Sequence, residues 1–262
     1  RSFNGLTGPI PPSVGKLAKS CKVPLVTYKF EGGYFTTPRW AYTMRRGRMR
    51  GYVANVYTVE QLKEMSADEV NAAIKADLFE DAYARQAIEK IRFEGKRLAE
   101  GLETALFICP HCKQVGTLQS KGSEFFCTCG LKATYDEYGY LSGAPYSTIT
   151  EWDSWQRRQL TQIAENLADK PAFVDAKVKL SVIEGNHKGK SADAGTGALA
   201  MYRDKIVCGA LIFAMDEISD MALYGRGNIA FTSLGKHYTI TGGRSFCGRK
   251  YLELYNQLRT TR

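Results

Sequence analysis

The sequence lacks any long uninterrupted hydrophobic run, and this absence sets the first limit on its function. No segment of about 18 consecutive apolar residues occurs, so we expect no helix that crosses a bilayer. A secretory signal is also missing, because the chain opens with RSFNG, which has neither a methionine nor an apolar stretch. We therefore expect that these 262 residues begin inside a longer protein. Internal repeats and low-complexity tracts are absent as well, which favours ordinary folded domains.

Acidic residues are scarce in the first fifth of the chain. Up to Thr58 there are ten lysines and arginines but a single acid, Glu31, so this segment alone accounts for the formal net charge of +9. The other 26 basic and 26 acidic residues balance. A basic excess confined to one segment indicates an anionic partner there, such as lipid headgroups, a phosphorylated substrate or nucleic acid. The alternative is a solvated face that serves solubility.

Cysteine is infrequent in the chain as a whole, yet four of the seven cysteines lie within 21 residues. In a chain without a secretory signal, such a cluster favours a metal site over disulfides. Two short cysteine turns that face each other can supply the four thiolates of a tetrahedral zinc site. We predict a structural zinc ribbon whose ligands are Cys109, Cys112, Cys127 and Cys129.

The cluster departs from the usual ribbon in one respect, because its second pair is spaced C-x-C. His111 is a possible substitute ligand, but we interpret it as a bystander. A catalytic zinc ion would need an open coordination position and a nearby base, and a redox disulfide would not explain the second pair. The remaining cysteines lie in apolar patterns and are predicted to be buried free thiols: Cys21, Cys208 and Cys247.

The helix and strand signals predict an α+β chain of three domains. Residues 1–104 read as the end of an α/β unit with trailing helices, 105–143 as the ribbon, and 144–262 as a β-rich domain. In the first domain a helix follows Pro11-Pro12, a buried strand covers 23–28, and a second strand covers 52–57. Residues 58–104 are predicted to be helical, with capping boxes at Thr58 and Ser66 and a long helical segment from Asp81 to Glu103.

In the β-rich domain a helix is predicted over 151–168 and a half-buried strand over 173–183, with Val174, Ala176 and Val178 pointing inward. A loop over 185–195 leads to a hairpin of strands 198–202 and 206–215, followed by strands over 228–232 and 237–241. A last helix covers 244–258. Antiparallel strands closed by a C-terminal amphipathic helix are the outline of a pleckstrin-homology (PH) or GRAM-like domain.

The first part of the chain resembles the 1-acylglycerol-3-phosphate (lysophospholipid) acyltransferase family. Arg1-Ser2 stand where a family block of the form E-G-x-R-S ends, and Val23-Pro24-Leu25-Val26 match a V-P-[IL]-V strand that follows it. The run GGYFTTPRWAYTMRRGRMRG, followed by helices and a ribbon, is similar to a bacterial subgroup with a zinc-ribbon extension. The resemblance covers residues 1 to about 140.

The resemblance implies transfer of an acyl chain from acyl-CoA or acyl carrier protein to a lysophospholipid, in phospholipid biosynthesis. In that family the histidine of an H-x4-D block acts as general base on a glycerol hydroxyl. No such block occurs in these residues, so we expect the base upstream of Arg1 and no activity from this chain alone. By the same resemblance, Arg1 and Ser2 would bind the phosphate of the acceptor.

The basic run is predicted to contact an anionic membrane or a phosphate, and its residues are Arg45, Arg46, Arg48 and Arg50. The membrane interpretation places nearby aromatic residues, among them Phe35 and Trp40, at headgroup depth and the protein peripherally on the cytoplasmic face. The alternative is a solvated loop whose aromatic residues belong to the core. Nucleic acid is not expected, because no reading module accompanies the run.

Two functional hypotheses remain open from the sequence alone. The first is the acyltransferase; the second is a non-catalytic module in which the ribbon and the β-rich domain bind a lipid, a protein or nucleic acid. The sequence upstream of Arg1 distinguishes them, since an H-x4-D block there supports the enzyme.

Overall fold

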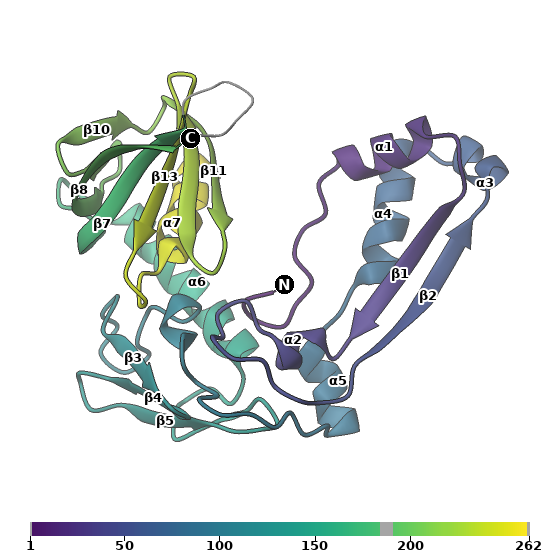
Figure 1. Ribbon diagram of the computed structural model, residues 1–262, viewed down its shortest axis with the longest axis horizontal. Coiled ribbons are helices and arrows are strands. Elements are labelled where there is room, and N and C mark those ends of the chain that lie inside the picture. Colours follow the sequence, from purple (N-terminus) through teal and green to yellow (C-terminus); the bar gives the residue numbers. More distant parts are fainter. Residues whose placement is uncertain (1, 184–190, 261–262) are drawn as a thin grey trace. The chain divides into compact units, whose positions relative to one another are not determined.

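The computed structural model describes residues 2–183 and 191–260 and divides into two compact units (Figure 1). Unit 1 comprises residues up to 98 together with 136–140, and unit 2 comprises residues 99–135 and 141–262. The three predicted domains differ from this division, because most of 105–143 belongs to the same unit as 144–262. Among the described residues, no helix combines the length and the apolar character needed to cross a bilayer.

Unit 1 is built around an antiparallel pair of strands, β1 (Leu25–Glu31) and β2 (Arg50–Tyr57). The helices α1 (Ser13–Ser20) and α4 (Ala67–Leu78) lie on one face of this pair. A small core there contains Leu62, Val70 and Ile74. The prediction of a buried strand over 23–28 is wrong. Successive side chains of a strand point to opposite faces, and only one face of β1 is covered. The other face of β1–β2 is exposed, with Phe30 retaining 64% of its accessible surface.

The helices of unit 1 confirm part of the predicted helical region. Thr58 and Ser66 form capping boxes at the starts of α3 (Val59–Glu64) and α4, which satisfies backbone N–H groups that have no intrahelical partner. The long predicted helix after Asp81 is wrong. Helix α5 (Ala82–Glu89) ends because Lys90 adopts a left-handed conformation with φ of 49°. Beyond it the chain is irregular until the short 3-10 helix η1 (Leu102–Thr104) of unit 2.

A second core of unit 1 is aromatic. Phe35, from the single-turn helix α2 (Gly33–Thr36), packs edge-on against Tyr83 with ring centroids 5.1 Å apart. Phe93 lies 5.2 Å from Phe35 on another side. The Tyr83 hydroxyl donates a hydrogen bond to the carbonyl of Gly139 (2.8 Å), which ties residues 136–140 to this unit.

Unit 2 contains the ribbon, a four-stranded antiparallel sheet in chain order. Its strands are β3 (Leu118–Lys121), β4 (Glu124–Cys127), β5 (Lys132–Tyr135) and β6 (Leu141–Ser142). Strand β4 leads directly into the second cysteine pair, since it ends at Cys127. Phe107 and Ile108 precede the strands of the ribbon and lead into a loop that is closed by an isolated bridge between Ile108 and Val115.

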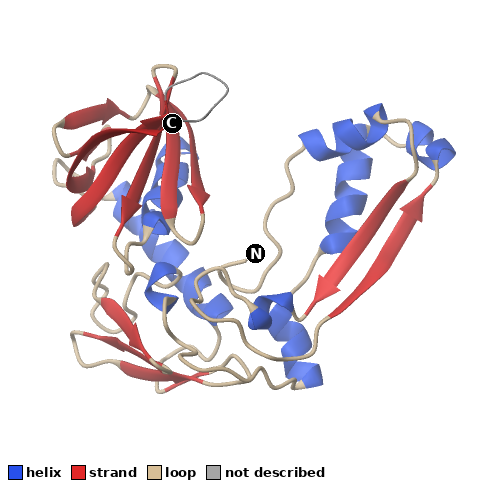
Figure 2. Ribbon diagram, in the orientation of Figure 1, coloured by secondary structure: helices blue, strands red, loops and turns tan. Residues whose placement is uncertain are grey.

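The β-rich part of unit 2 is a curled sheet (Figure 2). Its seven antiparallel strands have the order β10-β9-β8-β7-β13-β12-β11. The first and last strands of this part of the chain, β7 and β13, are therefore neighbours. The strands are β7 (Phe173–Ile183), β8 (Ser191–Met201), β9 (Lys205–Cys208), β10 (Leu211–Ala214), β11 (Ile218–Tyr224), β12 (Asn228–Ser233) and β13 (Lys236–Gly242). Helix α7 (Gly248–Thr260) follows the sheet, and its Tyr251, Leu254 and Leu258 enter the sheet's core.

The ribbon and the curled sheet share one hydrophobic core. Phe107 and Ile108 from the ribbon belong to the same buried cluster as Leu180 and Ile229 of the sheet. Leu160 of helix α6 (Ile149–Glu165) also lies in that cluster. This shared core accounts for the single compact unit, because separate domains would each have a core of their own.

Several strand predictions need correction. Residues 191–195, expected in a loop, begin β8, and 185–190 of that loop lie outside the described residues. Residues 206–215 form two strands that turn at Gly209, and β11 was not predicted at all. A register shift between Asp175 and Val178 reverses the alternation in β7, so Phe173 is buried and Val174 is exposed, contrary to prediction.

Candidate metal centre

The four clustered cysteines converge on one point in unit 2. Their sulfur atoms all lie within 4.8 Å of one another. The Sγ atoms of Cys109 and Cys129 are 3.7 Å apart, and those of Cys112 and Cys127 are also 3.7 Å apart. These separations are far longer than a disulfide bond of about 2.05 Å. They match the roughly 3.8 Å between thiolates of a tetrahedral site with zinc–sulfur distances of about 2.3 Å. The four cysteines could therefore hold a metal ion.

Each cysteine pair sits on a tight turn that requires unusual backbone conformations. After Cys109, the N–H of Lys113 bonds to the Cys109 carbonyl (2.9 Å) while Lys113 takes a positive φ of 60°. After Cys127, Gly130 closes the second turn through its N–H to the Cys127 carbonyl (3.0 Å), with φ of 97°. A glycine is suited to that position because it lacks the Cβ that disfavours positive φ. The C-x-C spacing is therefore compatible with a convergent site.

The thiols differ in acidity before any metal binds. Burial raises the pKa of Cys109 to about 12. Burial also acts to raise the pKa of Cys127, but hydrogen bonds from the Cys129 backbone and from the Thr117 hydroxyl outweigh it and bring the pKa to about 6. Metal binding must therefore displace thiol protons, so affinity for a metal ion falls as the pH falls.

A buried polar network on α6 holds the segment that enters the first cysteine turn. The Gln156 side chain accepts hydrogen bonds from the N–H of Phe107 (2.9 Å) and donates to the carbonyl of Ala105 (2.9 Å). The Trp152 indole N–H donates to the carbonyl of Ile108 (3.0 Å). Because a buried backbone group without a partner costs about 1–3 kcal/mol, these contacts fix the path of the chain next to Cys109.

The same network extends to α7 through a buried ion pair. The Arg249 guanidinium lies 2.8 Å from a carboxylate oxygen of Asp153, and it also donates to the carbonyl of Ala105 (2.9 Å). Burial acts to raise the pKa of Asp153, but attraction to Arg249 outweighs it and leaves the pKa below its ordinary value. Sequence reasoning missed this pair, although Asp153 directly follows the buried Trp152 in α6.

The remaining cysteines and the histidine of the cluster have distinct environments. Cys208 and Cys247 are buried, as predicted, but Cys21 is exposed and that prediction is wrong. Cys21 follows the end of a short surface helix whose neighbouring Leu17 is also exposed, so no core reaches it. His111 is exposed, with Nδ1 3.4 Å from the sulfur of Cys129. It lies beside the four-sulfur set and is not part of it.

The residues predicted to bind the acceptor phosphate lie at the amino terminus of unit 1. Arg1 lies outside the described residues. The Ser2 hydroxyl accepts hydrogen bonds from the N–H groups of Asn4 (3.2 Å) and Gly5 (3.0 Å), so it stabilises a turn. Its role toward a phosphate stays a prediction.

The structure places the four arginines of the basic run in different environments. Arg45 is buried and donates to the carbonyls of Phe35 (3.3 Å) and Leu98 (2.5 Å), so its predicted contact with a membrane or phosphate must be corrected. Arg50 forms ion pairs with Glu31 and with Glu89 (2.7 Å), which satisfy its charge within unit 1.

Arg46, Arg48 and Arg50 are all exposed, but the guanidinium of Arg50 is held by its two ion pairs. Phe35 and Trp40, expected at headgroup depth in the membrane interpretation, are buried in unit 1. The alternative in which the aromatic residues belong to the core is thus confirmed for these two. The charged part of the predicted contact surface is reduced to Arg46 and Arg48.

Comparison of the chain with protein-family models, with curated proteins and with solved structures finds no match.

Proposed function

We propose that the four-cysteine centre binds one zinc ion with a structural role. The observation that supports this proposal is the convergence of four sulfurs at 3.7 Å paired separations, which leaves no coordination position for a substrate. The ion would link the loop that carries Cys109 and Cys112 to the turn between β4 and β5 that carries Cys127 and Cys129. Zinc binding by such a site can contribute on the order of 10 kcal/mol of folding free energy.

Metal analysis of reduced protein tests this proposal. We expect one zinc ion per chain in the wild type and its loss in Cys127→Ser. Cys21→Ser is the matched control, because it removes an exposed thiol outside the cluster and should keep the metal. A wild type that holds no zinc when purified without chelators would contradict the proposal.

We further propose that the chain is part of a glycerolipid acyltransferase that acts at an anionic membrane surface. One observation on unit 1 supports a lipid interface: the open face of β1–β2 carries a row of exposed apolar side chains. Val26 pairs with Val56 and Tyr28 pairs with Val53 on that face, and Phe30 lies beside Tyr28. Apolar surface with adjacent cations is the chemistry that binds the interface of anionic bilayers.

The exposed cations lie at the end of this strand pair. Arg46 and Arg48 immediately precede β2, and an exposed methionine, Met49, stands between Arg48 and the strand. Each such charge contributes about 1 kcal/mol near an anionic leaflet. In this proposal the strand face contacts the acyl boundary and the two arginines contact lipid phosphates, peripherally on the cytoplasmic side.

Sedimentation with vesicles of phosphatidylcholine and phosphatidylserine tests the lipid interface. We expect the wild type to bind and the double variant Arg46→Ala, Arg48→Ala to bind about tenfold or more weakly, from the loss of two charges. Arg158→Ala with Lys236→Ala removes two exposed charges from unit 2 and serves as the control. Equal sedimentation of all three proteins would reject this surface.

The catalytic part of the proposal rests on the resemblance. The sequence contains no H-x4-D pattern, so the catalytic histidine and aspartate of the parent enzyme would lie outside these residues. Acyl-CoA or acyl carrier protein is the donor and a lysophospholipid is the acceptor. The test is the gene itself, followed by an acyl-transfer assay of its full product with lysophosphatidate. An H-x4-D block whose His→Ala variant loses transfer supports the enzyme, and a full-length product without that block rejects it.

The curled sheet supports a PH or GRAM-like role for the second half of unit 2. The sequence suggested several antiparallel strands closed by one C-terminal helix, and the seven antiparallel strands with a helix packed on the sheet are compatible with that outline. The alternative function is a non-catalytic module in which the ribbon and this sheet bind a lipid, a protein or nucleic acid. Lipid binding that persists in the isolated parent gene product without any acyl transfer would favour it.

A further inference from the structure

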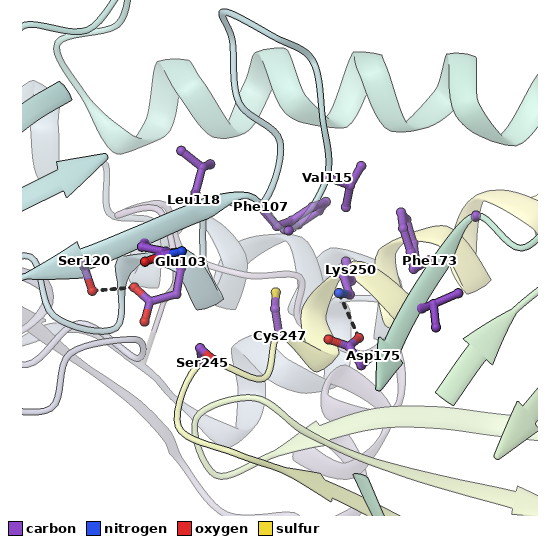
Figure 3. A pocket seen from close by; sticks show the side chains of 14 residues that line it. Glu103, Phe107, Val115, Leu118, Ser120, Phe173, Asp175, Ser245, Cys247 and Lys250 are labelled. Atoms are coloured by element: carbon purple, nitrogen blue, oxygen red, sulfur yellow. Dashed lines mark hydrogen bonds and ion pairs between the residues drawn. The ribbon is translucent and has the colours of Figure 1, made fainter. Parts of the chain in front are cut away.

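A cavity of about 600 Å³ lies within unit 2, between the ribbon and the curled sheet (Figure 3). On the ribbon side it is lined by Glu103, Phe107 and Leu118, and on the sheet side by Phe173 and Asp175 of β7. Its volume falls within the roughly 300–1,000 Å³ that is typical of small-molecule sites. Neither the metal centre nor the proposed lipid interface uses this space.

The cavity has an ion pair on its sheet side. The Lys250 ammonium lies 2.8 Å from a carboxylate oxygen of Asp175, and the Tyr251 hydroxyl donates to the same oxygen (2.5 Å). The same ammonium stands 5.8 Å from the ring centroid of Phe173. The positive charge of Lys250 is thus already balanced within the protein, as Figure 3 shows by the dashed line between Lys250 and Asp175.

The ribbon side of the cavity carries a carboxylate with no cation. Glu103 accepts a hydrogen bond from the Ser120 hydroxyl (2.5 Å), which Figure 3 also shows. Among the described residues, no lysine or arginine forms an ion pair with Glu103. Its charged neighbour is Glu100, and burial together with that negative charge raises the pKa of Glu103. The exposed Arg244 side chain forms an ion pair with Glu100, at 3.7 Å.

The charged side chains of the lining therefore sum to one excess negative charge, in a lining that contains both polar and apolar groups. Glu103 and Asp175 are the acids and Lys250 is the cation, while the buried Cys247 thiol stays neutral because burial raises its pKa to about 11. A charge that is partly removed from water is stabilised strongly by an opposite charge placed beside it. Phe107, Val115 and Leu118 contribute hydrocarbon groups to the same lining.

We propose that this cavity binds a small organic amine as its ammonium cation, with Glu103 as the charged partner and Phe107, Val115 and Leu118 around the alkyl chain. A metal ion does not suit the site, because among the described residues the grouping able to hold a metal is the cysteine cluster. Magnesium and calcium also require about six or more oxygen ligands. An anion is disfavoured because the lysine at the cavity is committed to Asp175.

The test uses n-butylammonium as the probe and n-butanol as its uncharged counterpart, with the zinc-loaded chain. Titration followed by NMR should shift the methyl signals of Val115 and Leu118, and butanol should bind at least about tenfold more weakly. That ratio corresponds to a single charge-assisted hydrogen bond. Absence of butylammonium binding, or equal binding of butanol, would overturn the proposal.

Variants locate the interaction. Glu103→Gln should weaken butylammonium binding about tenfold or more, while Glu124→Gln should not change it, because Glu124 is an exposed carboxylate elsewhere on the same ribbon. Ser120→Ala keeps the charge of Glu103 but removes its hydroxyl partner, and it should alter the affinity severalfold even if Glu103→Gln fails to fold. Unchanged affinity in Ser120→Ala and in a folded Glu103→Gln would show that the amine binds elsewhere.

Discussion

Adjacent arginines in unit 1 have opposite environments. Arg45 is enclosed, with its guanidinium 4.9 Å from the ring centroid of Trp40 and hydrogen-bonded to backbone carbonyls, whereas Arg46 points to solvent. Composition alone treats the two as equal members of a basic run. The difference arises because the backbone of Arg46 pairs with Glu94 as an isolated bridge, which turns successive side chains to opposite sides.

This contrast predicts different costs for the same substitution. Arg45→Ala should lower the free energy of unfolding of unit 1 by about 3 kcal/mol, because buried carbonyls lose charged donors and the Trp40 ring loses its cover. Arg46→Ala should change it by less than about 0.5 kcal/mol. Urea unfolding followed by tryptophan fluorescence measures both.

Arg45→Lys provides the control for charge. A lysine keeps the positive charge but cannot present several donors in a planar fork, so it should restore little of the loss. Full recovery by lysine would show that charge, and not the guanidinium geometry, stabilises this position.

Helix α6 connects the segment that carries the first cysteine pair to the curled sheet. Its buried polar side chains, Asp153 and Gln156, bind the chain before Cys109 on one side and Arg249 of α7 on the other. The apolar positions of this helix were predictable from their 3.6-residue spacing. The buried polar positions were not predictable, because the sequence does not show that the Asp153 carboxylate forms an ion pair with Arg249, which is far away along the chain.

Asp153→Asn should destabilise unit 2 by about 3–5 kcal/mol, since it leaves Arg249 as a buried charge without its partner. The pKa of Asp153 is lowered in the folded state. Its contribution is therefore fully present above the unfolded-state pKa of about 3.9 and is lost as the pH falls through the folded pKa. The stability difference between wild type and variant should be constant from about pH 5 to 8 and shrink at lower pH.

Urea titrations of both proteins at a series of pH values measure this difference. Acid also releases metal from the cysteines, but it does so in both proteins, so the comparison isolates Asp153. Asp169→Asn, which changes an exposed carboxylate after α6, is the control. A difference that stays constant to the lowest accessible pH would contradict the assigned role.

At the scale of the whole chain, the sequence predicted much of the element content but not its grouping. The cluster of four cysteines, two capping boxes, β7, β12, β13 and the two long helices of unit 2 follow from local spacing. The shared core of ribbon and sheet does not, because it depends on contacts such as those of Phe107 with residues far along the chain. The cavity escaped prediction for a related reason: the register shift in β7 is what turns Asp175 inward.

The shared core predicts the consequence of metal removal. If zinc stabilises the ribbon by up to about 10 kcal/mol, chelation should weaken hydrogen-exchange protection in the ribbon and also in α6 and α7. The strands and helices of unit 1 should keep their protection, because their cores are formed by residues of unit 1. Exchange measured by mass spectrometry with and without chelator tests this, and loss of protection confined to the cysteine turns would argue against a shared core.

The exposure of Cys21 gives the protein a practical handle. Four of its thiols would be occupied by metal, and two are enclosed, with burial raising the pKa of Cys208 and Cys247 to about 11. A maleimide dye added to metal-loaded protein would therefore attach at a single place, the end of α1. A fluorophore attached to Cys21 would therefore report on the unfolding of unit 1 without any engineered substitution.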